Sequence, residues 1–393
     1  MVEYDEAIFL DVAHNIQRSG LPVRSIGANG VFYFEHTSLY PYLLNLYATN
    51  SSNEVFLARM MTTLFSLSCV LLVYSIGKQV NGNVAGFLSA LLVGINPFWT
   101  LYSFFVCMEI PMTFFMLIGL LIIVKSKQGK SLLAAGVALG VAVLLKEVAL
   151  LFVGICGIYA LLKFRHDRRL MWKAPLYVVV PAVIAVLAWG IWCWALAPSA
   201  FASTMLRWVG STIGPGVRDP RMSLTPIQWV NRIIFDLLDW PLAVSWLLAL
   251  IVWLACRRRR LLDCVLLGYP VSAIGLSFAF RLKEPRHLIG ILPMIALFVG
   301  YNVDWTRLWK WAQGRRARGI IGAIAISIFL LFASPLRLPL HHFRHLNAWI
   351  DPLYAWRIFE NDRYYNVLRM AGLYLQERTE PDEVVTVLHE ATV

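Results

Sequence analysis

LARMMTTLFSLSCVLLVYSIGKQVNGNVAGFLSALLVGINPFW, residues 57–99, holds two apolar runs, near 55–77 and 83–99, that are joined by a short polar turn. A helix needs about 20 apolar residues to cross a hydrocarbon core roughly 30 Å thick. Both runs come close to that length and carry almost no charge. This stretch therefore predicts two membrane-crossing helices rather than part of a soluble domain.

Apolar runs of similar length recur over most of the chain. Further runs lie near 103–124, 131–146, 147–163, 174–197, 240–256, 261–280, 286–303 and 319–334. Together they make about ten candidate spans. The 393 residues are 59% hydrophobic and only 15% charged, whereas a soluble domain is about 25% charged. The sequence predicts an all-α polytopic membrane protein and excludes an ordinary cytosolic enzyme, a disordered chain and a disulfide-stapled scaffold.

Positive charge gathers in alternate short loops. The basic residues after the third, fifth and seventh runs and before the tenth are Lys125, Lys127, Lys130, Lys163, Arg165, Arg168, Arg169, Lys173, Arg257, Arg258, Arg259, Arg260, Arg307, Lys310, Arg315, Arg316 and Arg318. All of these loops fall on one side if the spans alternate, and the positive-inside rule makes that side the cytoplasm. Most of the net charge of +12 is then an orientation signal, and we expect no nucleic-acid partner.

This topology divides the chain into three parts. Residues 1–54 form a first outer loop with amphipathic helices, 55–334 form the transmembrane bundle, and 335–393 form an outer C-terminal segment. No apolar signal precedes the first outer loop, and the strand pattern near 382–388 has no partner strand after it. We therefore expect an upstream membrane helix, and a small outer domain of which this chain holds only the start.

No cofactor motif is evident. The six cysteines form no CxxC pair, and most lie in apolar runs, as small buried hydrophobic residues do. The chain contains no Walker A lysine motif, no GxGxxG after a strand and no HExxH. ATP-driven transport therefore loses support, and we assign no metal-ligating residues.

Acidic residues stand out at two outer positions. Asp5 and Glu6 begin an amphipathic run that Gly20 ends, and as plain helix signals they would be an N-cap and a first-turn acid. Glu109 lies in FVCMEIP, residues 105–111, at the outer start of a span. An ionisable group near membrane depth is costly, so Glu109 is a candidate functional residue.

Outer cations are fewer, and they run against the positive-inside bias. One cluster consists of Arg281, Lys283, Arg286 and His287. It suits an anionic headgroup or a phosphate. Lys146 lies in another outer turn beside Glu147, where an ion pair or a snorkelling lysine is the alternative. His36, in EHTSLYP, is more commonly a surface hydrogen-bonding residue than a ligand-binding one.

Carboxylates and cations on one face suit a reaction with a phosphate leaving group. A carboxylate takes a proton from an acceptor hydroxyl or amine, while cations stabilise the departing phosphate.

Taken in order, these features resemble the GT-C glycosyltransferases, in the branch of the protein O-mannosyltransferases and the bacterial aminoarabinose lipid A transferases. The matching marks are Asp5-Glu6 in YDEAIFLDVAHNIQRSG, the run from Arg59 to Pro97, Glu109 as the second-loop acid, GVALGVAVLLK ending in Lys146, and Arg286-His287-Leu288 to Pro293, with His where Tyr is usual. The likeness covers nearly the whole chain. It implies a GT-C type transmembrane helix bundle with outward juxtamembrane helices and the start of a small outer α/β segment.

The resemblance also implies a reaction. A sugar moves with inversion from a polyprenyl-phosphate donor to a lipid, glycan or protein acceptor, at the outer side of the plasma (inner) membrane. Asp5 is the implied catalytic base, while Glu6 and Glu109 orient the acceptor, or bind a divalent metal where one is used. The implied substrate-binding residues are Lys146 and Arg286 for the donor phosphate, with Arg281, Lys283, His287 and His36 as further candidates.

Two alternatives stay open on the residues alone. A secondary transporter or flippase would favour inverted repeats and charged residues at span midpoints, whereas the ionisable residues here gather at one surface. An inactive truncated relative of the enzyme would fit the missing segments expected at both ends.

Overall fold

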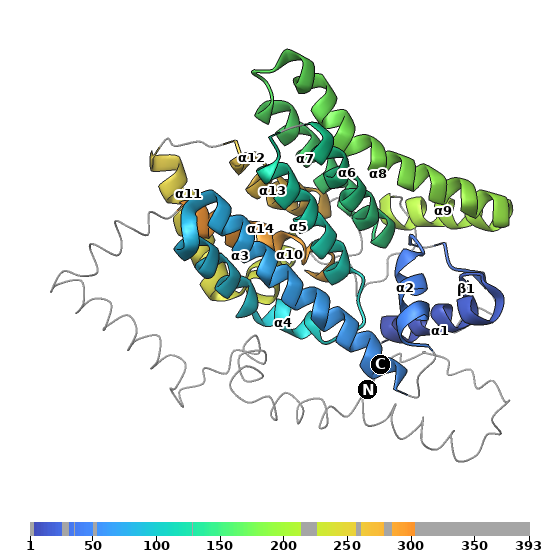
Figure 1. The fold of residues 1–393 in the computed structure, drawn as a ribbon. Coiled ribbons are helices and arrows are strands. Elements are labelled where there is room, and N and C mark those ends of the chain that lie inside the picture. Colours follow the sequence, from blue (N-terminus) through green and yellow to red (C-terminus); the bar gives the residue numbers. More distant parts are fainter. Residues whose placement is uncertain are drawn as a thin grey trace, which may run out of the picture. The chain divides into compact units, whose positions relative to one another are not determined.

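The computed structural model describes residues 4–25, 31–34, 36–49, 53–127, 129–213, 226–256, 261–278 and 285–302. All of them lie within one compact unit, Met1–Ala323. This part of the chain is almost entirely helical, with a single two-stranded hairpin, which confirms the predicted all-α class (Figure 1). The run at 319–334 and the expected outer segment at 335–393 lie outside the described residues.

The first outer loop folds on a helix pair. Helix α1 (Tyr4–Ser19) is followed by β1 (Val23–Arg24), β2 (Val31–Phe32) and α2 (Leu39–Tyr47). Apolar residues at helical spacing bury one face of α1; they are Ile8, Phe9, Val12, Ala13 and Ile16. Gly20 ends the helix with φ of 74°, a conformation that costs glycine little.

Helix α3 (Glu54–Gly94) contains both of the opening apolar runs. Its backbone breaks at Asn81 and at Gly82, where φ is 86°, so the two runs form two helical arms (Figure 1). The arms touch at glycines, since a Cβ on Gly77 would lie 2.8 Å from the Cα of Gly86. Asn81 Nδ2 also donates to the carbonyl of Tyr301 at 3.0 Å and so ties the bend to the last described helix.

Most of the remaining elements fall within the predicted runs, some of which are broken, but three helices lie at 198–238, between two of the predicted runs. The remaining elements are α4 (Pro97–Ser103), α5 (Glu109–Lys125), α6 (Gly129–Leu145), α7 (Ala149–Lys163), α8 (Arg168–Leu196), α9 (Pro198–Ile213), α10 (Pro226–Arg232), the π-helix η1 (Ile233–Leu238), α11 (Asp239–Cys256), α12 (Asp263–Leu266), α13 (Gly268–Ser277), the 3₁₀ helix η2 (Pro285–Leu288) and α14 (Ile291–Asn302). The run at 103–124 does not begin as a helix, because a loop separates α4 from α5. That loop carries residues of the site.

Among the described helices, α3 and α8 are long and apolar enough to cross a membrane. The bent pair 226–238 and 242–254 adds a third span if it is taken as one. Shorter apolar helices lie at 131–145, 149–163, 263–277 and 291–302. Several predicted spans are therefore short helices packed inside the bundle; α14, for example, is buried along almost its whole length.

Close packing and one half-buried lysine fix the central helices. A Cβ on Gly136 of α6 would lie 2.1 Å from the carbonyl oxygen of Tyr177 in α8, so the two backbones touch where only glycine fits. At the far end of α5, Lys163 Nζ donates to the carbonyls of Ile123, Val124 and Ser126 at 2.6, 2.8 and 2.9 Å. A cation at a helix C-terminus satisfies unpaired carbonyls and opposes the helix dipole. Glu109 lies at the opposite, N-terminal end of α5.

Candidate active site

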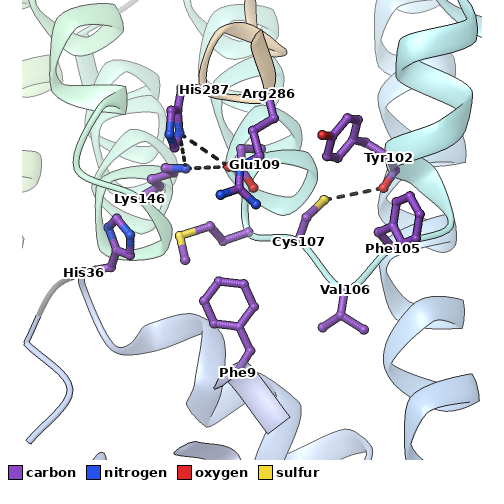
Figure 2. A pocket seen from close by; sticks show the side chains of 11 residues that line it. Phe9, His36, Tyr102, Phe105, Val106, Cys107, Glu109, Lys146, Arg286 and His287 are labelled. Atoms are coloured by element: carbon purple, nitrogen blue, oxygen red, sulfur yellow. Dashed lines mark hydrogen bonds and ion pairs between the residues drawn. The ribbon is translucent and has the colours of Figure 1, made fainter. Parts of the chain in front are cut away.

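A cavity lies where the first outer loop meets the starts of α5 and α7 and the helix η2. Its empty volume is about 370 Å³, including its open mouth. It is lined by Phe9, His36, Tyr102, Phe105, Val106, Cys107, Met108, Glu109, Lys146, Arg286 and His287 (Figure 2). These residues come from five segments that are distant in sequence. Only the tertiary fold brings them together.

Glu109 and Lys146 form the buried centre of the cavity. Lys146 Nζ donates to Glu109 Oε1 at 2.5 Å, and the two residues are 2% and 4% exposed. Glu109 opens α5, and Lys146 follows the last turn of α6. A carboxylate at a helix N-terminus and an ammonium at a helix C-terminus are each stabilised by the helix dipole. The helix dipoles thus stabilise each of the two charges independently of the ion pair between them.

His287 lies on the other side of the lysine. Lys146 Nζ is 3.0 Å from His287 Nδ1, which is itself 3.8 Å from Glu109 Oε1 (Figure 2). Burial, followed by the positive charge of Lys146, lowers the pKa of His287 well below its usual value. The imidazole is therefore neutral at neutral pH and accepts from the ammonium through Nδ1, so the proton of this ring resides on Nε2.

Arg286, next to His287 on η2, lines the same cavity. Lys146 and Arg286 are two permanent cations, and Glu109 is the one carboxylate among the described lining residues. With His287 neutral, the described lining carries excess positive charge. Such a site favours an anion with several acceptor oxygens, such as a phosphate.

His36 enters the cavity from the segment between β2 and α2. Its Nδ1 is 3.0 Å from Oε1 of Glu147, the neighbour of Lys146 in the α6–α7 link. Each of the two side chains is 25% exposed. The hydrogen bond expected for His36 is therefore made to a carboxylate, while the ring itself borders the cavity.

Glu6, for which the resemblance implies a role beside Asp5 in orienting the acceptor, makes its described contacts with α3 and the α4–α5 loop. It is fully buried and accepts hydrogen bonds from Arg59 Nε at 3.0 Å and Nη2 at 2.7 Å. The backbone N–H of Val106 also donates to its Oε1 at 2.7 Å. Glu6 is not among the cavity-lining residues. It ties α1 to α3 and to the loop that carries the cavity wall.

Three other predicted residues cannot be placed in the same way. Asp5 belongs to α1, but its side chain lies outside the described part of the structure. Arg281 and Lys283 also lie outside the described residues. Among the side chains that are described, no group of three His, Cys, Asp or Glu residues has the arrangement of a metal site.

Sequence reasoning did not anticipate the aromatic wall. Phe9, Tyr102 and Phe105 line the cavity together with the charged residues. Phe9 reads in sequence as a core residue of an amphipathic helix. Phe105 belongs to the run at 103–124 that predicts a span, and Tyr102 comes just before that run. NPFW, residues 96–99, caps and begins the short helix α4, and its Asn-Pro pair is a sequence hint that the apolar stretch is interrupted here.

Comparison with known proteins adds to this geometry. Residues 35–192 match the family model of the dolichyl-phosphate-mannose-protein mannosyltransferases. The matched range includes His36, Glu109, Lys146 and Glu147. No curated protein sequence matches the chain significantly.

Solved structures share the fold at low sequence identity. ArnT from Cupriavidus metallidurans, bound to undecaprenyl phosphate, is similar with a TM-score of 0.61 and 15% identity; the match covers 96% of this chain and 69% of that one. The archaeal oligosaccharyltransferase AglB from Archaeoglobus fulgidus, in complex with an inhibitory peptide and a dolichol-phosphate, gives 0.58 and 14%, over 97% of this chain and 54% of AglB. These matches and the family model confirm the resemblance: the chain has the fold of the GT-C membrane glycosyltransferases.

Proposed function

We propose that the protein is an inverting glycosyltransferase that moves a sugar from a polyprenyl-phosphate donor to an acceptor at the outer face of the membrane. The observation that carries the proposal is the cavity in which Lys146 and Arg286 meet Glu109. The donor's phosphate supplies the negative charge that this lining favours. ArnT was solved with undecaprenyl phosphate and AglB with a dolichol-phosphate, and both ligands have this chemistry.

In the proposed reaction, Lys146 and Arg286 bind the donor phosphate and stabilise the charge that develops on it as the bond to the sugar breaks. Glu109 holds Lys146 at the cavity and balances the charge of this buried ammonium. Asp5, at the start of α1, takes the proton of the acceptor hydroxyl or amine on the opposite face of the sugar, as inversion requires. Glu6 anchors the loop that forms the cavity wall.

The membrane arrangement belongs to the same proposal. Residues 1–54 form the first outer loop, 55–334 the transmembrane bundle and 335–393 an outer C-terminal segment. The active site then faces outward from the plasma (inner) membrane, at the end of the bundle opposite Lys163. Lipids, glycans and proteins all remain acceptors to be tested.

The first test is binding of undecaprenyl phosphate to the purified chain in lipid nanodiscs. Lys146→Gln and Arg286→Gln should each weaken binding about tenfold or more, since each removes a charge-assisted hydrogen bond. Lys127→Gln is the matched control, because Lys127 is exposed at the far end of α5. Asp5→Asn should leave binding unchanged and abolish sugar transfer from a labelled donor.

Absence of binding by a folded wild-type chain would refute the donor assignment. Full transfer activity in Asp5→Asn would refute the base alone and leave the donor site standing.

A further inference from the structure

Glu147 and His36 form a second acidic–basic pair beside the Glu109–Lys146 pair. They are 111 positions apart in sequence, and the distance from His36 Nδ1 to Glu147 Oε1 is 3.0 Å. His36 lines the cavity, whereas Glu147 is not among the lining residues. The carboxylate of Glu147 therefore contacts the His36 ring from outside the cavity lining.

The chemistry of the pair fixes the state of the imidazole. An ionised carboxylate only accepts hydrogen bonds, so His36 Nδ1 carries a hydrogen. The carboxylate thus sets the orientation and the tautomer of the ring, as carboxylates do in other histidine-containing active sites. The second ring nitrogen, Nε2, is then the atom through which His36 gains or loses a proton.

Consecutive residues give Lys146 and Glu147 separate tasks. Lys146 pairs with Glu109 and His287, while Glu147 pairs with His36. The other charged or titratable residues that line this cavity are Tyr102, Cys107, Glu109, Lys146, Arg286 and His287. The charge of Lys146 is largely balanced by Glu109, and His287 is neutral. An imidazolium as a class gives up its proton near neutral pH, whereas a guanidinium does not, so a protonated His36 would add a proton donor of a kind that Arg286 is not.

We propose that Glu147 is a positioning residue for His36, and that His36 donates a proton to the phosphate oxygen released from the donor. The idea rests on the proposed function. The bond from the anomeric carbon to the phosphate oxygen breaks, and its electron pair stays on that oxygen, which takes the proton from His36 Nε2. The acceptor oxygen bonds to the anomeric carbon and loses its proton to Asp5. His36 ends neutral, Asp5 ends protonated, and the net charge is unchanged.

The experiment measures undecaprenyl phosphate binding between pH 5.5 and 8.5 in nanodiscs, for the wild type, His36→Gln and Glu147→Gln. The affinity ratio of wild type to His36→Gln cancels the titration of the phosphate itself. This ratio should rise about tenfold toward low pH, because protonated His36 makes a charge-assisted hydrogen bond. In Glu147→Gln the rise should become smaller, since the ring is no longer held in the orientation in which Nε2 meets the phosphate.

His14 and Glu54 supply a matched control. Their side chains form a similar pair at 2.6 Å, and neither residue lines the cavity. Glu54→Gln should leave the pH profile of binding unchanged. A Glu147→Gln variant whose affinity falls by one constant factor at every pH would overturn the positioning role, as would a flat ratio for His36→Gln. In both cases wild-type binding would still support the donor site.

Discussion

At the residue scale, the charge at the centre of the cavity depends on hydrogen bonds among three side chains, with Lys146 between Glu109 and His287. Lys146 donates both to Glu109 and to His287. The lysine is almost completely buried, and an unpaired ammonium at that depth would be costly. The carboxylate balances its charge, and the neutral imidazole accepts one of its remaining hydrogens. Lys146 therefore has hydrogen-bond partners at the cavity although only one of the two, Glu109, is a carboxylate.

The lowered pKa of His287 makes stability depend on pH. The folded protein resists protonation of this ring, whereas the unfolded chain takes up the proton below about pH 6.5. Stability from this residue is thus fully present above that pH and is lost as the pH falls. The melting temperature of His287→Asn in detergent should drop less than that of the wild type between pH 7.5 and 5.5. The side-chain oxygen of Asn still accepts from Lys146.

The difference should amount to at most about 1.4 kcal/mol per pH unit. His166→Asn serves as the control, since His166 is exposed in the turn before α8. Parallel melting curves for wild type and His287→Asn at all pH values would contradict the neutral, lysine-bonded ring.

At the element scale, α1 is attached to the bundle through Glu6. Its carboxylate accepts hydrogen bonds from the guanidinium of Arg59 in α3 and from the backbone N–H of Val106 in the α4–α5 loop. The guanidinium of Arg59 also lies 5.7 Å from the ring centre of Phe105 in the same loop. Two elements that line the cavity, α1 and the α4–α5 loop, are therefore joined to α3 at a single carboxylate. The position of the cavity wall depends on it.

Glu6→Gln should lower the free energy of unfolding by about 1–3 kcal/mol, because the partly exposed Arg59 loses its charged partner. Undecaprenyl phosphate binding should weaken as the loop shifts. Adding Arg59→Met should recover part of the stability, since the uncompensated cation is then gone. A Glu6→Gln variant with normal stability and binding but no transfer would instead indicate a direct catalytic role for Glu6.

At the scale of the whole molecule, the charges define two ends of the bundle. Lys125, Lys127 and Lys163 lie at one end of α5. Glu109, Lys146 and the cavity lie at the other end. Ionisable groups gather at the ends of the helices, which fits an enzyme that works at one membrane face better than a transporter with a charged midplane.

Labelling with a membrane-impermeant maleimide tests this orientation. Arg18→Cys, exposed at the end of α1, should react in intact cells, because the first outer loop faces outward. Arg165→Cys, exposed after α7, should react only after permeabilisation. The parent chain, measured in parallel, gives the background from native cysteines; those that are described are buried or half-buried. The reverse labelling pattern would invert the topology and contradict an outward active site.

The sequence by itself determined the class of the fold and the two helix ends at which the charged residues Glu109 and Lys146 lie. Apolar length, the scarcity of charge and the placement of Lys and Arg are one-dimensional properties, so the membrane bundle follows from the chain. The same holds for the isolated charges at Glu109 and Lys146, because a charge beside an apolar run is visible without a fold.

Only the tertiary structure decided which of these groups meet. Glu109 contacts Lys146 over 37 positions and His36 contacts Glu147 over 111, and such distances depend on helix packing rather than on local pattern. Packing also separated Glu6 from the cavity and broke the run at 103–124 into α4, a loop and α5. The physical reason is that apolar periodicity records that a residue is buried, whereas its partner is fixed by contacts such as Gly136 against Tyr177 that bring distant helices to one place.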